Sequence, residues 1–547
     1  MASDSTIDTS DADRVYLFDT TLRDGQQTRG VDFTVADKAA IARALDQLGI
    51  DYIEGGWPGA NPTDDRFFAE PPKMDNARIV AFGMTRRPGR SADNDPGLAG
   101  ILDARVPAVC LVGKTWDFHV DVALEIERDE NVAMVRDSIA RAVAVGREAM
   151  FDCEHFFDGF KANPDYALDC AEAAYTAGAR WVVLCDTNGG TLPHEIEEIV
   201  AKVAERVPGT HLGIHCHNDT GNAVANSLAA VRAGARQVQG TINGLGERCG
   251  NADMMAIIPN LVVKMGMTTN VGTGKLKHLT AVSRLLDERL NRASDPHRAY
   301  VGAAAFAHKG GLHVSAVQKD PKTYEHVEPS TVGNQRHILV SDQAGRSNIL
   351  ARFAEIGVEV DPKHPKVQRL VDEVKEKEFL GYSYDSAEAS FELLARRLIE
   401  GVPEFFTIER WRVMDERRFN ARGDLVIESE ATATLTVGGT AHHEVAVGNG
   451  PVNALDTAIR KALTPKFPAI QTMRLIDYKV RILPPARDGD GTDATTRVMI
   501  ESEDETGITW RTVGVSPNII DASIAALSDA ITWKLLRAGA AAPKADA

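Results

Sequence analysis

Two histidines separated by one residue, His215 and His217, stand in the segment HCHND at the end of an apolar stretch. In an extended strand alternate side chains share a face, so both imidazoles point to one side and Cys216 to the other. Two imidazoles that converge at a strand end can bind a metal ion. The alternative for such a pair is two packed or surface histidines. Polar residues that follow the neighbouring strands favour the metal site.

Oxygen donors elsewhere in the chain would complete the ligand set. Asp24 offers a carboxylate, and Asn251 is a candidate side-chain amide. One carboxylate with room for water or substrate suits octahedral Mg²⁺ or Mn²⁺, with Zn²⁺ as an alternative. The set contains no thiolate, which argues against a closed structural zinc site. An open metal site is a Lewis acid that polarises a carbonyl oxygen.

Further charged and glycine-rich segments stand near these ligands in the sequence. Arg23 supplies fixed positive charge where an oxyanion or enolate develops, unless it only neutralises Asp24. Glu154 is either a proton carrier or a structural hydrogen-bond acceptor. The glycine-rich run 243–251 can bring its backbone close to a phosphate-bearing cofactor.

The elements that must position these residues form a repeating βα pattern. Residues 34–37 resemble a capping box at the start of the first helix. No GxGxxG follows the first strand, so a dinucleotide fold is disfavoured. We predict a closed (β/α)8 barrel, whose active site lies at the carboxyl ends of the strands. The eight strand candidates are 15–19, 51–54, 79–82, 108–112, 149–152, 181–185, 212–217 and 236–241.

Three joints between a helix and the next strand look alike: LGIDYIE, AGARWVV and AGARQVQ. In each, a glycine ends a helix and the following residues enter a buried strand. The glycines are Gly49, Gly178 and Gly234. Their similarity supports a series of equivalent units over an open doubly wound sheet.

The rest of the chain changes character twice. After a catalytic barrel over 14–265 we predict a helical linker subdomain over 266–404 and a C-terminal α+β regulatory domain over 405–540. The last domain contains an internal repeat, since 446–459 and 512–524 both indicate a strand, a tight turn and a helix. Residues 1–13 and 541–547 are expected to be disordered tails.

Bulk composition limits the function classes. The chain has 547 residues, 44% of them hydrophobic and 25% charged, which is typical of a globular protein with several folded units. A formal charge of −17 disfavours nucleic acid or an anionic membrane as partner. Six cysteines without a CxxC pair indicate reduced thiols and a cytoplasmic protein. No apolar run is long enough for a membrane span.

Several motifs together resemble the isopropylmalate and homocitrate synthase superfamily of acyltransferases, and within it the long-form citramalate synthase branch. The similarity covers nearly the whole chain apart from the two tails. The motifs are FDTTLRDGQQ, YIEGGWPGANPTDDRFF, FDCEHFFDGFKANPDYAL, DTNGGTLP, HCHNDTGNAVANSLAAVRAGA, NGLGERCGNAD and, near the C-terminus, GNGPVNALD, DYKVRILPP and VGVSPNIIDAS.

The resemblance implies roles for individual residues. It assigns Asp24, His215, His217 and Asn251 as metal ligands. Arg23 would stabilise developing charge, Glu154 would assist proton transfer, and Thr187 would contact the carboxylate of a 2-oxo acid. His313 and Tyr324 resemble a pair that activates the methyl group of acetyl-CoA; the family often has SGxHQD where this chain has GGLHVS. The substrate-binding set that we predict is Arg23, Thr187, Asn243, Gly244 and Gly246.

The reaction implied is a metal-dependent Claisen condensation of acetyl-CoA with pyruvate and water, giving (R)-citramalate and CoA in isoleucine biosynthesis. A 2-isopropylmalate synthase acting on 2-oxoisovalerate in leucine biosynthesis is the nearest alternative. A metal-dependent aldolase or lyase and a non-catalytic binding protein are further alternatives. Selectivity between the two acids depends on pocket volume. The strand-end residues expected to line that pocket are Phe82, Met84, Leu111 and Asp152.

The repeat in the C-terminal domain suggests how the barrel is regulated. We expect a homodimer, with a branched amino acid, isoleucine in the first place, binding at its interface and inhibiting the barrel. The expected small-molecule partners are therefore pyruvate, acetyl-CoA and isoleucine, with a divalent cation as cofactor.

Overall fold

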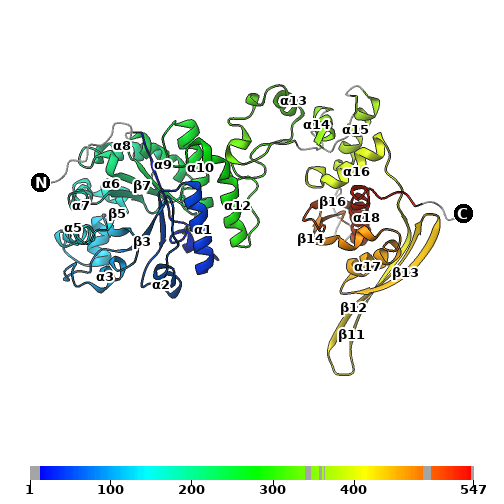
Figure 1. The fold of residues 1–547 in the computed structure, drawn as a ribbon, viewed down its shortest axis with the longest axis horizontal. Coiled ribbons are helices and arrows are strands. Elements are labelled where there is room, and N and C mark those ends of the chain that lie inside the picture. The colour runs from blue at the N-terminus through cyan, green and yellow to red at the C-terminus, as the bar shows by residue number, and fades with distance from the viewer. Residues whose placement is uncertain (1–12, 339–345, 356–359, 362–363, 484–493, 544–547) are drawn as a thin grey trace. The chain divides into compact units, whose positions relative to one another are not determined.

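A computed structural model describes residues 13–338, 346–355, 360–361, 364–483 and 494–543. The chain divides into two compact units (Figure 1). The first contains the chain up to residue 306 together with 327–336, and the second contains 307–326 and the chain from 337 onward. The predicted tails fall mostly outside the described residues, and the predicted domain boundaries at 265, 404 and 540 stay predictions.

The first unit is a closed barrel of eight parallel strands, which confirms the predicted fold. Each strand pairs with its neighbours in chain order, and β8 closes the barrel against β1. All eight strand candidates form strands. They are β1 (Tyr16–Asp19), β2 (Tyr52–Gly56), β3 (Arg78–Met84), β4 (Ala108–Lys114), β5 (Glu148–Glu154), β6 (Trp181–Asp186), β7 (Leu212–Cys216) and β8 (Gln237–Gly240).

Helices surround this barrel, as the blue-to-green ribbon of Figure 1 shows. At the start of α1 the Thr34 and Asp37 side chains form the predicted capping box. The three joint glycines have positive φ, at 102°, 101° and 117° for Gly49, Gly178 and Gly234, as expected of a helix end that only glycine adopts freely. The helices are α1 (Val35–Leu48), α2 (Pro62–Ala69), α3 (Pro96–Leu102), α4 (Asp117–His119), α5 (Arg128–Ala144), α6 (Phe156–Ala162), α7 (Pro164–Thr176), α8 (Pro193–Val203), α9 (Ala223–Arg232), α10 (Met254–Pro259), α11 (Gly272–Lys275) and α12 (Leu279–Arg289).

Alternation along the strands divides the hydrophobic core into two layers. Side chains such as Phe18, Cys110 and Trp181 fill the inside of the barrel, and those such as Leu17, Leu111 and Val182 pack outward against the helices. Polar residues stand at the carboxyl ends of the strands, beyond the inner apolar layer. Because the strands are parallel, these polar residues lie together at one mouth of the barrel.

The second unit begins with helices and ends with two similar halves. The helices that precede the two halves are α13 (Gly311–Lys319), α14 (Arg346–Glu355), α15 (Pro365–Phe379) and α16 (Glu388–Ile399). A short strand pair, β9 (Ala307–His308) and β10 (His337–Ile338), accompanies them. None of the described helices is long and apolar enough to cross a membrane.

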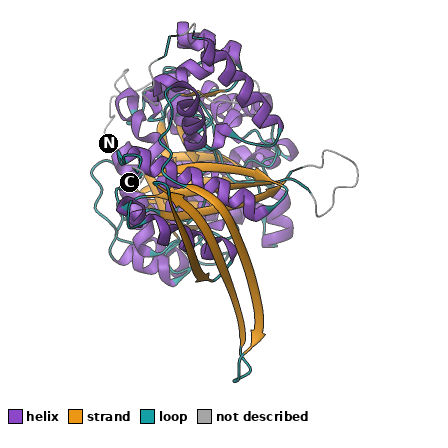
Figure 2. Cartoon of the chain, turned by 90° about the vertical axis from the view of Figure 1, so that its right-hand side faces the viewer, coloured by secondary structure: helices purple, strands orange, loops and turns teal. Residues whose placement is uncertain are grey.

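The predicted internal repeat is present as two antiparallel three-stranded sheets, each followed by a helix. Pro451 stands in the first turn of α17, and Asn518, which follows Pro517, caps α18. Strands β11 and β12 extend as a long hairpin (Figure 2). The elements are β11 (Thr407–Phe419), β12 (Leu425–Val437), β13 (Thr440–Gly448) and α17 (Pro451–Leu463), then β14 (Arg474–Ile482), β15 (Thr496–Glu503), β16 (Thr509–Ser516) and α18 (Ile519–Arg537).

Candidate active site

Three predicted metal ligands converge at the mouth of the barrel. The two imidazole Nε2 atoms of His215 and His217 lie 3.3 Å apart. The Asp24 carboxylate oxygen Oδ2 lies 3.2 Å from the first and 3.7 Å from the second. Cys216 is buried on the opposite face of β7, as the alternation predicts. Asp24 follows β1, His215 lies near the end of β7 and His217 directly follows that strand, so barrel closure brings together residues nearly 200 positions apart.

The spacing of these donor atoms suits a divalent cation. Donors at neighbouring octahedral positions, about 2.1 Å from an ion, lie about 3 Å from one another. The fourth predicted ligand, Asn251, pairs with His217 in an isolated β-bridge, and its amide nitrogen Nδ2 donates a hydrogen bond to Asp24 Oδ2 at 2.9 Å. Its Oδ1 is buried and has no hydrogen-bond partner among the described residues. One carboxylate and two imidazoles at this spacing fit a divalent cation such as Mg²⁺ or Mn²⁺, and the ligand role of Asn251 stays a prediction.

A glycine makes room for the Asn251 amide. A Cβ at Gly246 would lie 2.3 Å from Asn251 Oδ1, closer than any side chain permits. Both backbone polar groups of Gly246 bond the Thr28 hydroxyl, which lies in the loop after β1. Gly246, predicted to bind substrate, thus contacts a candidate ligand directly.

The charges in this cluster shift the pKa values of Asp24 and the two histidines in different directions. Burial alone would raise the pKa of Asp24, but Arg23 and His215 outweigh it and hold the pKa well below its usual range. Burial and the neighbouring His215 lower the pKa of His217 to about 4. Asp24 as a carboxylate and His217 as a neutral imidazole are in the protonation states that bind cations. The hydrogen bond and charge of Asp24 outweigh burial and raise the pKa of His215, so cation binding displaces a proton from that imidazole.

Arg23 lies beside the cluster but is not mainly a partner of Asp24. Its Nε donates to the Glu54 carboxylate at 2.7 Å, whereas its closest contact with Asp24 is 3.8 Å. The guanidinium lies over the Phe82 ring, 3.9 Å from its centroid. Held by Glu54 and Phe82, this cation keeps a fixed place at the rim of the cavity.

Sequence analysis missed a buried hydrogen-bonded chain behind the ligands. The side-chain oxygen Oε1 of Gln239 contacts His215 Nδ1 at 2.8 Å, and the side-chain nitrogen Nε2 donates to the Asp152 carboxylate at 3.1 Å. Glu54, fully buried, receives the Arg23 bond and one from Thr20. Gln239 and Glu54 occupy inward positions of strands, where a polar side chain is unusual; that was the signal available in the sequence.

Two more predicted residues line the same cavity, which has a volume of about 340 Å³. Glu154 ends β5 and forms a 2.5 Å ion pair with Lys114, the last residue of β4. The Thr187 hydroxyl accepts a hydrogen bond from the His155 backbone at 2.8 Å, which leaves its own proton to donate. Arg248 donates to the Thr187 carbonyl at 2.7 Å and fixes this loop.

Other predicted residues lie outside this cavity. The Asn243 side chain bonds Ser283 and Asp287 of α12, and with Gly244 it lines a separate polar cavity. His313 and Tyr324 belong to the second unit, where their rings contact each other with centroids 4.3 Å apart. Their roles stay predictions.

The apolar wall of the cavity corrects one expectation. Phe82, Met84 and Asp152 line the cavity as expected, but Leu111 does not. Leu111 is fully buried in the outer layer, because Cys110 and Val112 on either side of it take the inward positions of β4. Trp57, in the loop after β2, lines the cavity without having been predicted.

Known proteins resemble the chain over its whole length. Residues 14–285 match the HMGL-like family, 300–379 the homocitrate synthase post-HMGL domain-like family, and 385–535 the LeuA allosteric (dimerisation) domain. The (R)-citramalate synthases of Aquifex aeolicus and Geobacter sulfurreducens are both 50% identical, over 96% and 95% of this chain and 98% and 97% of theirs. A probable 2-isopropylmalate synthase of Methanopyrus kandleri is 34% identical over 94% of this chain and 97% of its own.

Proposed function

The chain belongs to the citramalate synthase family, and we propose that it condenses acetyl-CoA with pyruvate and water to give (R)-citramalate and CoA. The observation that carries this proposal is the buried Asp24, His215 and His217 cluster beside the Arg23 guanidinium. The higher identity to (R)-citramalate synthases than to the probable 2-isopropylmalate synthase supports pyruvate as the 2-oxo acid.

The reaction needs a polarised ketone carbonyl as electrophile and the carbanion of the acetyl methyl group as nucleophile. A divalent ion held by Asp24, His215, His217 and Asn251 supplies Lewis acidity toward the ketone oxygen. A base takes a proton from the acetyl methyl group, and the resulting electron pair forms the bond to the ketone carbon. The ketone oxygen receives the negative charge and then a proton. Water attacks the thioester carbonyl, and CoA leaves as the thiol.

The residues at the barrel mouth match these needs. Arg23 keeps its positive charge at all relevant pH values and stabilises the oxygen that becomes negative. The Thr187 hydroxyl donates to the carboxylate of the 2-oxo acid. Glu154, held by its ion pair with Lys114, assists proton transfer to the new hydroxyl group. For His313 and Tyr324 we propose the activation of the acetyl methyl group.

Release of CoA from acetyl-CoA tests the function. Pyruvate, 2-oxobutanoate, 2-oxoisovalerate and 2-oxoglutarate are offered separately, each with Mn²⁺ and with EDTA. We expect metal-dependent release that is fastest with pyruvate, and its loss in His217→Ala. Faster release with 2-oxoisovalerate would make the chain an isopropylmalate synthase, and no release with any acid would refute the condensation.

We also propose a homodimer that isoleucine inhibits, acting in isoleucine biosynthesis in the cytoplasm. The match to the LeuA allosteric (dimerisation) domain supports the dimer, and the repeated sheet-and-helix halves support an effector site. The free cysteines, five of them buried, are typical of a reducing compartment. Isothermal titration of the full chain with isoleucine and with leucine tests the effector; binding of neither amino acid would refute it.

A further inference from the structure

The metal cavity has a polar side and an apolar side. Three of the predicted ligands, Asp24, His215 and His217, come from the end of β7 and the loop after β1. The apolar side chains come from the ends of β2, β3 and β4 and are those of Trp57, Phe82, Met84 and Val112. A 2-oxo acid whose carboxylate and ketone face the ligands directs its alkyl group toward this apolar wall. The wall therefore meets the part of the substrate in which one 2-oxo acid differs from another.

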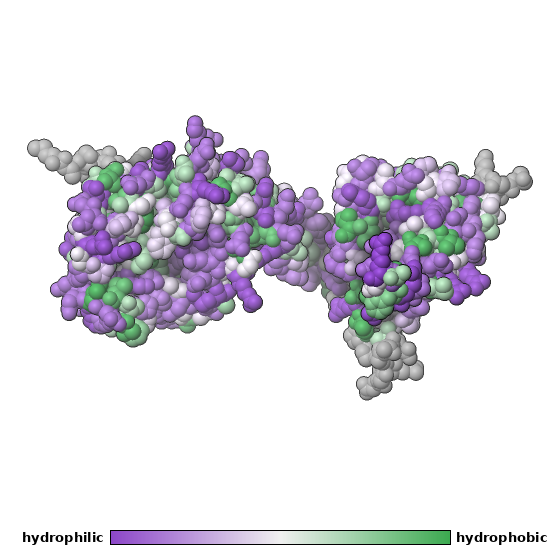
Figure 3. Space-filling model, turned by 90° about the horizontal axis from the view of Figure 1, so that it is seen from below, coloured by the Kyte–Doolittle hydropathy of each residue, from purple (hydrophilic) through white to green (hydrophobic). Residues whose placement is uncertain are grey.

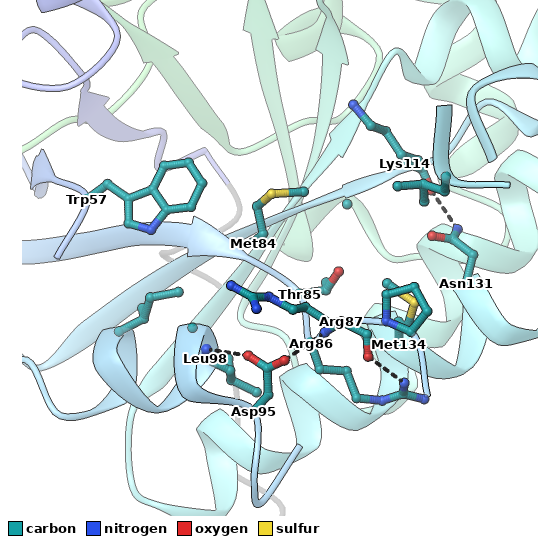
Figure 4. A pocket seen from close by; sticks show the side chains of 15 residues that line it. Trp57, Met84, Thr85, Arg86, Arg87, Asp95, Leu98, Lys114, Asn131 and Met134 are labelled. Carbon is teal, nitrogen blue, oxygen red and sulfur yellow. Dashed lines mark hydrogen bonds between the residues drawn. The ribbon is translucent and has the colours of Figure 1, made fainter. Parts of the chain in front are cut away.

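A second cavity of about 250 Å³ shares part of this wall; Figure 4 shows the residues that line it. Most of its exposed lining surface is apolar and comes from residues such as Leu98 and Ile101 of α3, Leu124, and Met134 of α5. Polar residues also line it, among them Arg86, whose guanidinium is paired with Glu130 and Asp137, and Arg87 and Asn131. The Asp95 carboxylate at its edge is already occupied by two backbone N–H groups, at 2.9 and 3.0 Å. Such a cavity favours an alkyl group over a polar one.

Three residues line both cavities: Trp57, Met84 and Lys114. Figure 4 shows Met84 between the other two. Lys114 is held by its ion pair with Glu154. Met84 has no such partner among the described contacts, and its thioether chain is unbranched and changes rotamer easily.

Trp57 is held more firmly than Met84. Its backbone N–H donates to Asp64 at 2.9 Å, and its ring meets the Phe82 ring edge-on with centroids 5.6 Å apart. Asp64 is in turn paired with Lys38, a lysine with no exposed surface. Met84 is therefore the adjustable part of the boundary between the two cavities.

We infer that Met84 determines substrate specificity by closing the second cavity to the alkyl group of the 2-oxo acid. This inference rests on the proposed function, and it adds the residue that limits the acid to pyruvate. With the Met84 side chain removed, the two cavities join and a longer alkyl group extends between Leu98 and Met134.

Kinetics of Met84→Ala test the inference, with Met84→Val as a second variant. One additional methylene in an apolar pocket changes kcat/KM by about 10-fold or more. We expect the ratio of kcat/KM for 2-oxoisovalerate to that for pyruvate to rise by at least about 10-fold. Titration calorimetry of each 2-oxo acid with Mg²⁺ and without acetyl-CoA should show the same change in relative affinity. Met414→Ala, an exposed methionine on β11, is the matched control and should leave the ratio unchanged.

A second substitution tests whether a change in specificity comes from access to the second cavity or only from the smaller side chain at position 84. Leu98→Phe fills the second cavity from α3, so Met84→Ala combined with Leu98→Phe should return the ratio to the wild-type value. An unchanged ratio in both Met84 variants would overturn the inference, as would a gain that Leu98→Phe does not reverse. Wild-type enzyme that releases no CoA with pyruvate would instead refute the proposed function.

Discussion

Gln239 is the side chain that joins the candidate metal site to the inside of the barrel. It contacts the ring nitrogen of His215 that faces away from the other ligands, and it donates to the buried Asp152. A partner of this kind fixes the orientation of the imidazole and so makes its other nitrogen available to a cation. The affinity of the site for metal therefore depends on a residue that binds no metal itself.

Replacing Gln239 by Leu should weaken Mn²⁺ binding by about 10- to 100-fold, because His215 loses the partner that orients it. Isothermal titration of the metal-free protein with Mn²⁺ measures this. Gln237→Leu is the matched control: it lies two residues away on β8, and neither of its side-chain polar atoms has a partner among the described residues. Equal losses in both variants would show that any change inside β8 disturbs the site.

Asp19, at the end of β1, should make stability depend on pH. Burial raises its pKa from 3.8 to about 7. Below pH 4 both the folded and the unfolded states are protonated. As the pH rises from 4 to 7 only the unfolded state ionises, so stability falls, by on the order of 4 kcal/mol in total. Above pH 7 both states are ionised and the loss is complete.

Asp19→Asn removes this titration. We expect the variant to match the wild type near pH 4 and to be more stable at pH 8, because an amide does not ionise. Denaturant unfolding of both proteins, followed by near-UV circular dichroism from pH 4 to 8, measures the difference. Parallel stability profiles would contradict the raised pKa.

Among the elements, the joints between helices and strands look equivalent in the sequence but have different surroundings. Gly49, after α1, and Gly234, after α9, both have positive φ. A Cβ at Gly49 would lie 2.8 Å from the carbonyl oxygen of Asn270, whereas a Cβ at Gly234 would meet nothing within 4 Å. The first joint therefore also requires close approach of a neighbouring backbone.

Gly234→Ala should cost about 1–2 kcal/mol of stability, which is the cost of a left-handed conformation for an alanine. Gly49→Ala should cost more, since the segment containing Asn270 must also move. Denaturant unfolding of the two variants compares these costs directly. Equal destabilisation of the two variants would mean that the segment containing Asn270 moves away from the new Cβ at no measurable cost in stability.

At the scale of the whole molecule, the proposed homodimer needs a surface on which two chains meet. At the free end of the β11–β12 hairpin, Phe419 is 71% exposed and Ile427 is 63% exposed. In Figure 3 this end of the hairpin faces the viewer and carries hydrophobic residues beside hydrophilic ones. Together with Leu425, which is 43% exposed, they make this end a candidate apolar patch for contact with another chain.

Ile427→Asp should therefore shift the full-length protein toward monomer, because an unpaired charge would be buried in the interface. Size-exclusion chromatography with light scattering measures the mass. Phe379→Asp on α15, where the phenylalanine is 90% exposed, is the control for a charge introduced elsewhere on the same unit. A dimer that persists in Ile427→Asp would place the interface away from the hairpin end.

Local regularities in the chain were enough to predict the barrel and its eight strands, and they placed Asp24, His215 and His217 at strand ends. The alternation of side chains along a strand put His215 and His217 on one face and Cys216 on the other. The helix-ending glycines and the repeated C-terminal units were equally visible, because each depends on residues that are close in sequence. The prediction that Leu111 lines the pocket did not apply this alternation. With Cys110 and Val112 facing inward, Leu111 between them must face outward.

The partners of these side chains depended on how the barrel closes. Arg23 bonds Glu54 rather than its neighbour Asp24, Gln239 connects His215 with Asp152, and Asn243 turns toward α12. These contacts join residues 24 to 87 positions apart, over distances that local periodicity does not specify. Packing of β8 against β1, and of α12 over the barrel, selects one partner among several that are chemically equivalent in the sequence.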